Sequence, residues 1–211
     1  WHFIKGFAEA SDPTNAWRQL AYDDSGWSNA PAPFYYGETA ITNATYPGTT
    51  LSDMQSNYTT IYLRREFVVE NRGNITNLIL LAQVDDGFVA WINGVPMTRF
   101  NAPAGDSIPY NAVATAQSTE PNNAGAAWTV FQMPASASAL VDGTNVIAVQ
   151  AFNQNLTNSS DFSFNAQLYT YLLDPTTVGP RLLEPEPRQG DTFTLANLLI
   201  TFSEPVHGVK A

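Results

Sequence analysis

The sequence predicts an all-β fold, an antiparallel β-sandwich. Strand-like segments recur along the chain with turn residues between them, and no stretch shows sustained helical periodicity. The 14 prolines and 13 glycines favour turns. Six or more strands of this kind bury their apolar faces most simply by packing as two sheets.

The first clear strand signals lie in the middle of the chain. Strands are expected at residues 61–69, 75–84 and 88–92. In the third of these, Phe88, Ala90 and Ile92 lie on one face, and Val89 and Trp91 lie on the other. Because both faces are apolar, residues 88–92 are predicted to be a central strand packed on both sides.

A hairpin and three later strands complete the predicted sandwich. Asn93-Gly94 is typical of a type I′ turn, which needs positive φ at both positions, so residues 95–99 are expected to return as a strand. Further strands are expected at 128–133, 145–152 and 161–171. Apolar and polar residues alternate from Phe162 to Leu168, which indicates a half-buried strand. The stretches 34–60 and 100–127 are expected to be long loops with packing or functional roles.

The composition changes after the predicted sandwich, which is assigned to residues 1–173. Residues 174–187 contain four prolines and are predicted to be a stiff linker. Residues 188–211 include a strand-like segment that is too short to fold alone. They are expected either to begin a further domain or to pair with a neighbouring molecule.

Composition and charge narrow the class of protein. Charged residues make up 13% of the chain and hydrophobic residues 44%, which is typical of an extracellular β-rich protein, so a secreted or cell-surface location is expected. The net charge of −10 argues against nucleic acid and anionic membranes as partners. No apolar run approaches the roughly 20 residues that cross a bilayer, so membrane insertion is not expected. The chain starts at Trp1 rather than Met, which suggests a processed or trimmed product.

Several kinds of side chain are missing from the body of the chain. There is no cysteine, and no His or Lys lies between Gly6 and Val206. This excludes Ser-His triads, Schiff-base lysines and His-ligated zinc there. Two facing carboxylates could still hydrolyse a glycosidic bond, but nothing in the sequence marks such a pair. We therefore expect a protein that is not an enzyme, and we assign no catalytic residues.

Carboxylates are the ligands that remain for a metal. Asp85, Asp86, Asp23 and Asp24 are candidate ligands for a structural Ca²⁺. Weaker candidates for the same role are Asp12, Glu38 and Asp161. The alternatives are that the two aspartate pairs shape turns by accepting backbone N–H bonds, or that they contact a ligand directly.

Aromatic and cationic side chains supply candidate ligand contacts. Tyr35, Tyr36 and Trp27 have rings that could stack on sugars, with core packing as the alternative. Arg99 is a fourth candidate ligand-binding residue. Arg64, Arg65 and Arg99 are otherwise expected to pair with Glu66, Asp85 or Asp86. Five Asn-X-Ser/Thr sequons are candidate glycan attachment sites, at Asn43, Asn57, Asn74, Asn155 and Asn158.

Four motifs in order resemble one known family. They are AWRQLAYDDSGWSNAPAPFYYGE, IYLRREFVV, VDDGFVAWINGVPMTRFN and DGTNVIAVQAFNQNLTNSSDFSFNAQL. Over residues 10–172 the chain resembles galactose-binding-like jelly-roll modules of large secreted bacterial proteins, which are related to sugar-binding domains of glycoside hydrolases. It departs from them at Phe152, where relatives often carry His. The tail from Pro180 resembles the first strand region of a bacterial immunoglobulin-like domain.

The resemblance implies a function. Such modules are non-catalytic and bind saccharides at their loops or concave sheet face, often with a structural calcium. We therefore expect a carbohydrate-binding or adhesion module of a multidomain protein, whose partner is a polysaccharide or glycan. The alternative is a structural subunit of a surface filament or layer, assembled when the C-terminal segment adds a strand to a neighbour's sheet.

Overall fold

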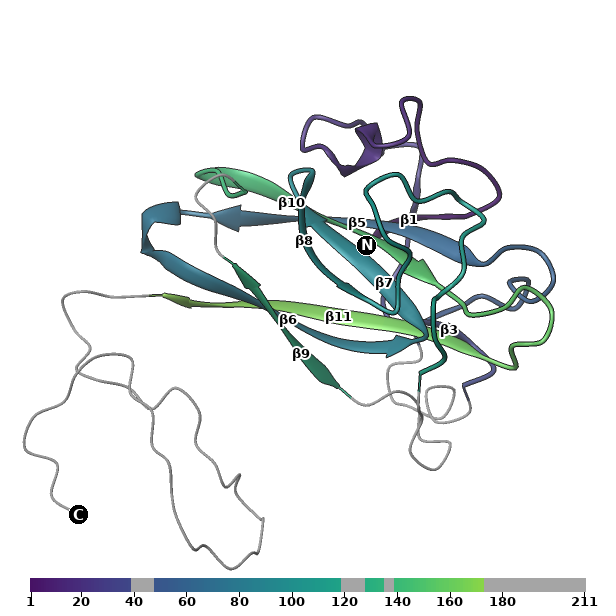
Figure 1. The fold of residues 1–211 in the computed structure, drawn as a ribbon. Coiled ribbons are helices and arrows are strands. Elements are labelled where there is room, and N and C mark those ends of the chain that lie inside the picture. The colour runs from purple at the N-terminus through teal and green to yellow at the C-terminus, as the bar shows by residue number, and fades with distance from the viewer. Residues whose placement is uncertain (39–47, 119–127, 135–138, 173–211) are drawn as a thin grey trace, which may run out of the picture. The chain divides into compact units, whose positions relative to one another are not determined.

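The fold is an all-β sandwich, which confirms the predicted fold class (Figure 1). The computed structural model describes residues 1–38, 48–118, 128–134 and 139–172. One sheet has six strands in the order β2 (Ser28–Asn29), β1 (His2–Lys5), β5 (Thr60–Val69), β10 (Gly143–Phe152), β7 (Gly87–Ile92) and β8 (Val95–Phe100). The other has five, in the order β4 (Thr49–Thr50), β3 (Phe34–Tyr36), β11 (Phe162–Leu172), β6 (Ile75–Asp85) and β9 (Thr129–Pro134).

All seven predicted strands are present, each within two residues of its expected bounds. The hairpin of β7 and β8 turns at Asn93 and Gly94, whose φ angles of 49° and 83° agree with the predicted turn. The pairs β1–β2, β1–β5, β5–β10, β10–β7, β7–β8, β3–β11 and β6–β9 are antiparallel, whereas β3 pairs with β4 in parallel. The short strands β1, β2, β3 and β4 were not predicted, nor were the 3₁₀ turns η1 (Ala16–Arg18) and η2 (Arg72–Asn74).

The main core lies between the two sheets. Alternate residues of β5, β10 and β7 point into it, such as Leu63, Val149 and Phe88, and they meet Leu80 of β6 and Phe164 of β11. All of these side chains are at most 1% exposed. Period-2 alternation therefore places one face of each strand in this core.

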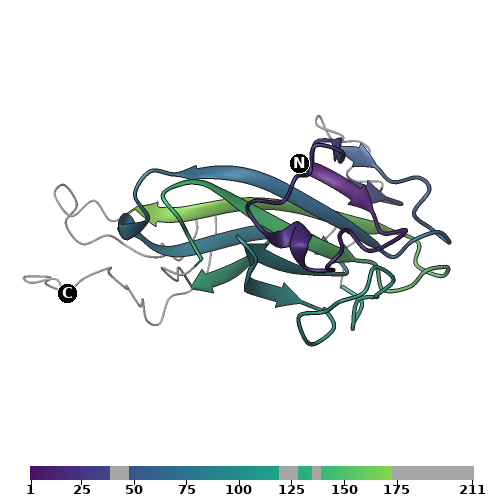
Figure 2. The same cartoon turned by 90° about the horizontal axis from the view of Figure 1, so that it is seen from above.

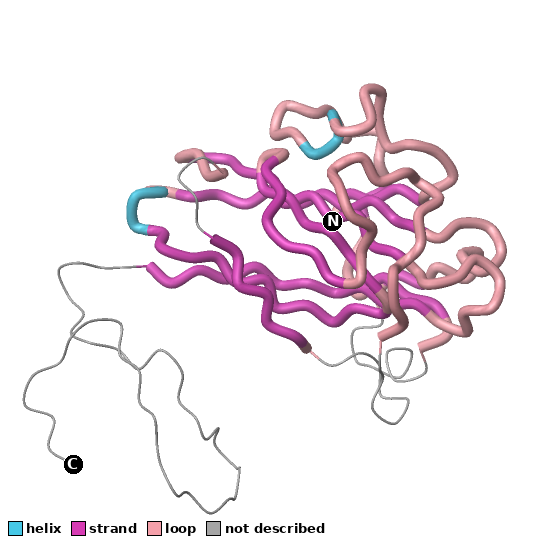
Figure 3. The backbone as a smooth tube through the Cα atoms, viewed as in Figure 1, coloured by secondary structure: helices cyan, strands magenta, loops and turns pink. Residues whose placement is uncertain are grey.

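A second apolar cluster covers the outer face of the six-stranded sheet. Trp91 of β7, Tyr62 of β5 and Phe152 of β10 lie there beneath Trp17 and Ile108, which come from the loops that precede β2 and follow β8. Figures 1 and 3 show these loops lying over the outer side of that sheet. Both faces of β7 are therefore buried, as its sequence predicts, and residues 101–118 have the packing role expected of that loop.

One side of the sandwich is only partly closed. β1 pairs with β5 only from Ile61 to Arg64, so from Arg65 onward β5 has a hydrogen-bonded neighbour, β10, on one side alone. β5 in one layer and β11 in the other run along this side (Figure 2). The end of β1 therefore leaves an opening between the sheets.

Other predictions fall beyond the described part of the chain. The linker at 174–187, the segment 188–211 with its immunoglobulin-like resemblance, and the sequon at Asn43 lie outside the described residues, and so does the strand-addition hypothesis. In the part of the chain that is described, no helix has the length and apolar character needed to span a membrane.

Candidate functional site

Three adjoining hollows line the open side of the sandwich, and Trp1 and Arg65 border all three. Their volumes are about 400, 600 and 260 Å³. We call them the β11 hollow, which reaches Leu168 and Tyr169, the amide hollow, which is lined by Asn29 and Gln167, and the Asp24 hollow. Together they form one groove, which we call the side groove.

The strand register explains why Arg65 enters this groove. Ile61, Leu63, Phe67 and Val69 of β5 belong to the main core, so the alternation places Arg65 on the same inner face. Arg65 is nevertheless exposed, because β1 has ended and the space between the sheets is open there. The core residues Leu80 and Ile147 form the floor of the β11 hollow beside it.

The lining of the amide hollow combines one ring, one guanidinium and three amides. The half-buried indole of Trp1 packs against the main core at the edge of the hollow. Asn29, Asn165 and Gln167 contribute the amides, and among the described lining residues Arg65 alone has a charged side chain, beside the N-terminal ammonium of Trp1. Indole rings present an apolar face, while amides and guanidinium groups offer several hydrogen-bonding atoms in a fixed plane.

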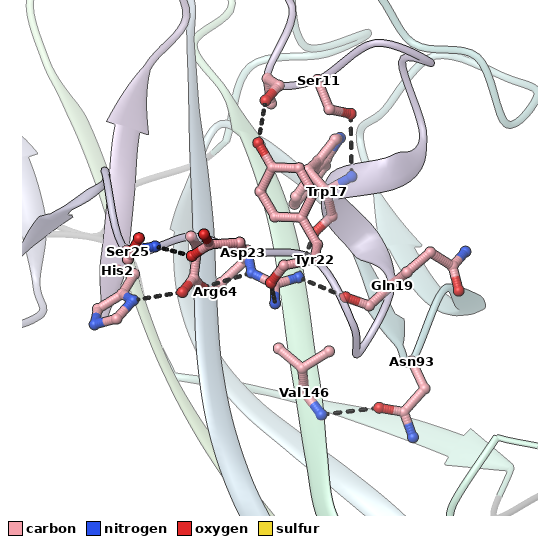
Figure 4. A network of polar contacts seen from close by, with 12 residues as sticks. His2, Ser11, Trp17, Gln19, Tyr22, Asp23, Ser25, Arg64, Asn93 and Val146 are labelled. Carbon is pink, nitrogen blue, oxygen red and sulfur yellow. Dashed lines mark hydrogen bonds and ion pairs between the residues drawn. The ribbon is translucent and has the colours of Figure 1, made fainter.

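The Asp24 hollow is bordered by a buried ion-pair network (Figure 4). Arg64, which is 2% exposed, donates from Nε to Asp24 Oδ2 over 2.6 Å. The same guanidinium donates to the carbonyls of Trp17, Gln19 and Tyr22 in the loop that covers the outer sheet face. Asp24 Oδ1 lies 2.9 Å from Nδ1 of His2 in β1. Arg64 therefore fastens this loop to β5.

The network also sets the ionisation of Asp24. Burial alone would raise the pKa of its carboxyl, but the hydrogen bonds and charges of Arg64 and His2 outweigh burial and hold the pKa below its usual value. Asp24 is therefore a carboxylate at neutral pH. Sequence reasoning paired Arg64 with Glu66, Asp85 or Asp86, and that expectation was wrong because the loop brings Asp24 to the outer face of β5.

Asp85 is the last residue of β6, Asp86 follows it before β7, and they are 3% and 2% exposed. Asp86 Oδ1 accepts the backbone N–H of Ser118 over 2.8 Å, and Oδ2 accepts that of Gln154 over 2.7 Å. The main-chain oxygen of Asp86 accepts from the side chains of Ser118 and Asn101. Asp86 thus connects three segments, its own turn, the loop after β8 and the loop after β10, which extends the predicted turn role to one of loop anchoring.

The other predicted metal ligands do not converge on Asp85 and Asp86. Asp23 Oδ1 accepts from the backbone N–H of Ser25, which is the turn role predicted for it, and this bond lowers the pKa of its carboxyl. Asp24 belongs to the Arg64 network, and Asp12 is exposed. Within the described ranges, no group of three or more His, Cys, Asp or Glu side chains is arranged to hold a metal ion.

We expect chelation to leave the stability of the fold unchanged. Asp86 and Asp24 already accept protein hydrogen bonds on both carboxylate oxygens, whereas Ca²⁺ in proteins needs six to eight oxygens. Thermal unfolding should be measured in millimolar Ca²⁺ and in EDTA. A midpoint that falls in EDTA would instead support the calcium site predicted from the sequence.

The predicted stacking residues are mostly buried. Tyr35 and Tyr36 of β3 are 3% and 7% exposed, and the Tyr36 hydroxyl bonds to Asn153 and Ser159 at the loop end of the sandwich. Trp27 packs against Tyr22 and Trp17 in the outer cluster. The prediction of an open platform at Tyr35 and Tyr36 was therefore wrong, and packing was the correct alternative. β3 lies inside the five-stranded sheet, between β4 and β11. The sequence pattern predicts a loop for these residues, and that prediction was wrong.

Arg99 lies on β8, at the far edge of the six-stranded sheet from β1. Its guanidinium donates to the carbonyls of Pro103 and Gly105, and it lies 3.9 Å from Asp106. The expected pairing with Asp85 or Asp86 was wrong. None of the three hollows includes Arg99 in its lining.

The groove residues Trp1, Arg65, Asn165 and Gln167 were not predicted as a site. One signal was available, because Arg65 interrupts an alternating apolar face in the strand that contains it. The contribution of Trp1 and the end of β1 depend on strand pairing, which the sequence pattern did not reveal.

Comparisons with known proteins give weak likeness to solved structures. No family model matches the chain, and no curated protein matches it. A β-glucuronidase from glycoside hydrolase family 2 is 16% identical over 73% of this chain and 13% of its own, with a TM-score of 0.39. The Bacteroides uniformis β-glucuronidase is 18% identical over 81% of this chain and 17% of its own length, with a TM-score of 0.43. The Ruminococcus gnavus β-glucuronidase is 12% identical over 72% of this chain and 20% of its own length, with a TM-score of 0.41.

The chain spans only 13% to 20% of the length of these proteins. A match at such identity and TM-score does not identify the function of this chain.

Proposed function

We propose that this chain is a non-catalytic carbohydrate-binding module of the galactose-binding-like kind, carried by a secreted or cell-surface protein that uses it for binding or adhesion. The lining of the side groove is the observation that supports this proposal. A half-buried indole, one guanidinium and three amides border a hollow of about 600 Å³. Sugars present an apolar ring face and a rim of hydroxyls, and this lining offers a partner for each.

The shape of the groove also fits an extended ligand. Its three hollows adjoin one another, since Trp1 and Arg65 border all of them. A ligand of several sugar rings would occupy more than one hollow at a time. The exposed rim residues Asn29 and Gln167 would then bind hydroxyls of successive rings.

The state of Asp24 argues against a role for this carboxylate as the general acid of a glycosidase. Asp24 and Glu66 border the same hollow, as two glycosidase carboxylates would. A general acid needs a raised pKa, however, and the pKa of Asp24 is lowered by its bonds to Arg64 and His2. Asp24 is suited to hold Arg64 rather than to deliver a proton to a glycosidic oxygen.

The groove predicts which residues a glycan needs. Trp1→Ala and Gln167→Ala are each expected to weaken binding about fivefold, because stacking and hydroxyl contacts each contribute of the order of 1 kcal/mol. Binding of the full chain should be measured against a glycan panel and insoluble polysaccharides. Release of reducing sugar from the same substrates should be assayed in parallel.

Trp128→Ala is the matched control, since the Trp128 indole is 40% exposed and lies next to β9 rather than in the groove. It should bind as the unchanged protein does. Gln167 is exposed, so Gln167→Ala will fold even if loss of the Trp1 ring perturbs packing. Equal binding by the Gln167→Ala and Trp128→Ala variants, or no glycan binding at all, would refute the groove as the site. Sustained release of reducing sugar would refute the non-catalytic role.

A further inference from the structure

We propose that the amide hollow selects a sugar bearing a carboxylate, so that the ligand of this module is a uronic acid-containing glycan. This inference rests on the proposed function and assigns a chemical class to its ligand. Arg65 would bind the carboxylate, while Trp1 and the amides would bind the ring that carries it.

The state of Arg65 is the first step. Six Lys and Arg residues lie in the described part of the chain, and five of them have protein partners. Lys5 pairs with Asp53, Arg64 with Asp24, and Arg99 with carbonyls of its own loop. Arg18 donates to the carbonyl of Asp106 and stacks on Trp91, and Arg72 donates to the carbonyl of Leu140. Among these described cations, Arg65 alone has no hydrogen bond or ion pair within the chain.

The position of Arg65 is the second step. It occupies an inner-face register of β5, so its side chain begins between the sheets and leaves through the opening beyond β1. A surface arginine would ordinarily project into solvent from the outer face. Arg65 instead borders every hollow of the groove, where a bound ligand would come into contact with it.

The charge around Arg65 is the third step. Glu66 borders the β11 hollow and the Asp24 hollow, and Asp24 borders the latter. Among the described residues that line the amide hollow there is no carboxylate, and the positive charges there are the Arg65 guanidinium and the N-terminal ammonium of Trp1, which already donates to the carbonyl of Ala30. A guanidinium binds a carboxylate through two parallel N–H bonds, which fixes the orientation of the sugar as well as its charge.

The negative net charge of the chain disfavours binding of polyanions at other parts of its surface. At −10, the protein repels polyanions in general, so a uronate chain would bind only where a local cation compensates. We therefore expect binding of a uronate oligomer to depend on the one side chain at position 65.

The test compares matched ligands on the full chain. Oligomers of galacturonate, glucuronate and mannuronate are each paired with the same oligomer after reduction of its carboxylates to hydroxymethyl groups. We expect at least one uronate oligomer to bind about tenfold or more tightly than its reduced form, and added salt to narrow the difference. Arg65→Gln should remove most of the preference, because it should lower the affinity for the uronate oligomer much more than the affinity for the reduced oligomer.

Two further variants sharpen the result. Arg65→Lys keeps the positive charge but loses the two parallel N–H donors of the guanidinium, so it should retain only part of the preference for the uronate oligomer. Arg99→Gln removes the same charge from a side chain that is 36% exposed on β8, and it should keep the full preference.

The possible outcomes distinguish a failure of the carboxylate assignment from a failure of the proposed carbohydrate binding. Equal binding of uronate and reduced oligomers, or an Arg65→Gln variant that keeps the preference, would overturn the carboxylate assignment and leave carbohydrate binding standing. Tighter binding of a sulfated oligomer than of the uronate would also overturn it. Failure to bind any oligomer, charged or reduced, would overturn the proposed function together with this inference.

Discussion

Arg64→Met is expected to destabilise the fold by about 3 kcal/mol, within the usual range for removing one partner of a buried ion pair. The substitution leaves Asp24 without its guanidinium and leaves the carbonyls of Trp17, Gln19 and Tyr22 without their donor. Because Asp24 is 19% exposed, water recovers part of the loss. Equilibrium unfolding in urea, followed by tryptophan fluorescence, measures the change.

The neighbouring residue supplies the control. Arg65→Met removes the same kind of side chain one position along β5, but the side chain of Arg65 is exposed and makes no hydrogen bond or ion pair, so a change below about 0.5 kcal/mol is expected. Equal destabilisation by the two variants would show that Arg64 does not anchor the loop.

The Arg64 effect should also depend on pH. The pKa of Asp24 is lowered in the folded protein, so its contribution to stability is complete above the unfolded value of about 3.9 and is lost as the pH falls through the lower folded value. The difference in unfolding free energy between the unchanged protein and Arg64→Met should therefore shrink below about pH 4. A difference that stays constant down to pH 2 would exclude Asp24 as the partner that matters.

Asp86→Ala is expected to cost about 2 to 4 kcal/mol, because it leaves two backbone N–H groups, those of Ser118 and Gln154, without an acceptor. Asp86→Asn keeps one acceptor oxygen but turns an amide donor toward the other N–H, so a loss of about half that size is expected. Urea unfolding measures both variants. Hydrogen exchange should also show faster exchange at the amides of Ser118 and Gln154.

Glu70→Gln is the matched control for Asp86→Asn. It makes the same change of carboxylate to amide at an exposed residue just after β5, and it should leave the unfolding midpoint unchanged. If Asp86→Asn were as stable as Glu70→Gln, the anchoring of the three segments would have to come from contacts other than the Asp86 carboxylate.

The long strands could be predicted because their signal is local. Alternation in β11, the apolar faces of β7 and the Asn93-Gly94 turn are each contained in a few consecutive residues, and each prediction was confirmed. The strands β1, β2, β3 and β4 have two to four residues, too few for a period to appear. β1 and β3 pair with the longer strands β5 and β11, and β2 and β4 pair in turn with β1 and β3, so these strands depend on the folded sheet and not on the segment alone.

The site could not be predicted in the same way, and Arg64 and Arg65 show why. Alternation from Ile61 and Leu63 places Arg65 inside and Arg64 outside, so a buried Arg65 and an exposed Arg64 would follow from the strand alone. The opposite is found, since the loop that carries Trp17 and Asp24 covers the outer face and β1 stops before Arg65. Burial here is decided by segments 40 or more residues away in the chain.

The pairing of β5 with β10 constrains how this protein reaches its native state. Thr60 pairs with Phe152 and Val69 with Gly143, so the two strands at the middle of the larger sheet come from opposite halves of the described chain. Bringing such distant segments together costs loop-closure entropy before any contact between them is formed. Topologies dominated by contacts of this range fold slowly for their size. During synthesis on a ribosome, β5 would remain unpaired with β10 until β10 had been synthesised. The apolar inner face of β5 would stay exposed throughout that interval.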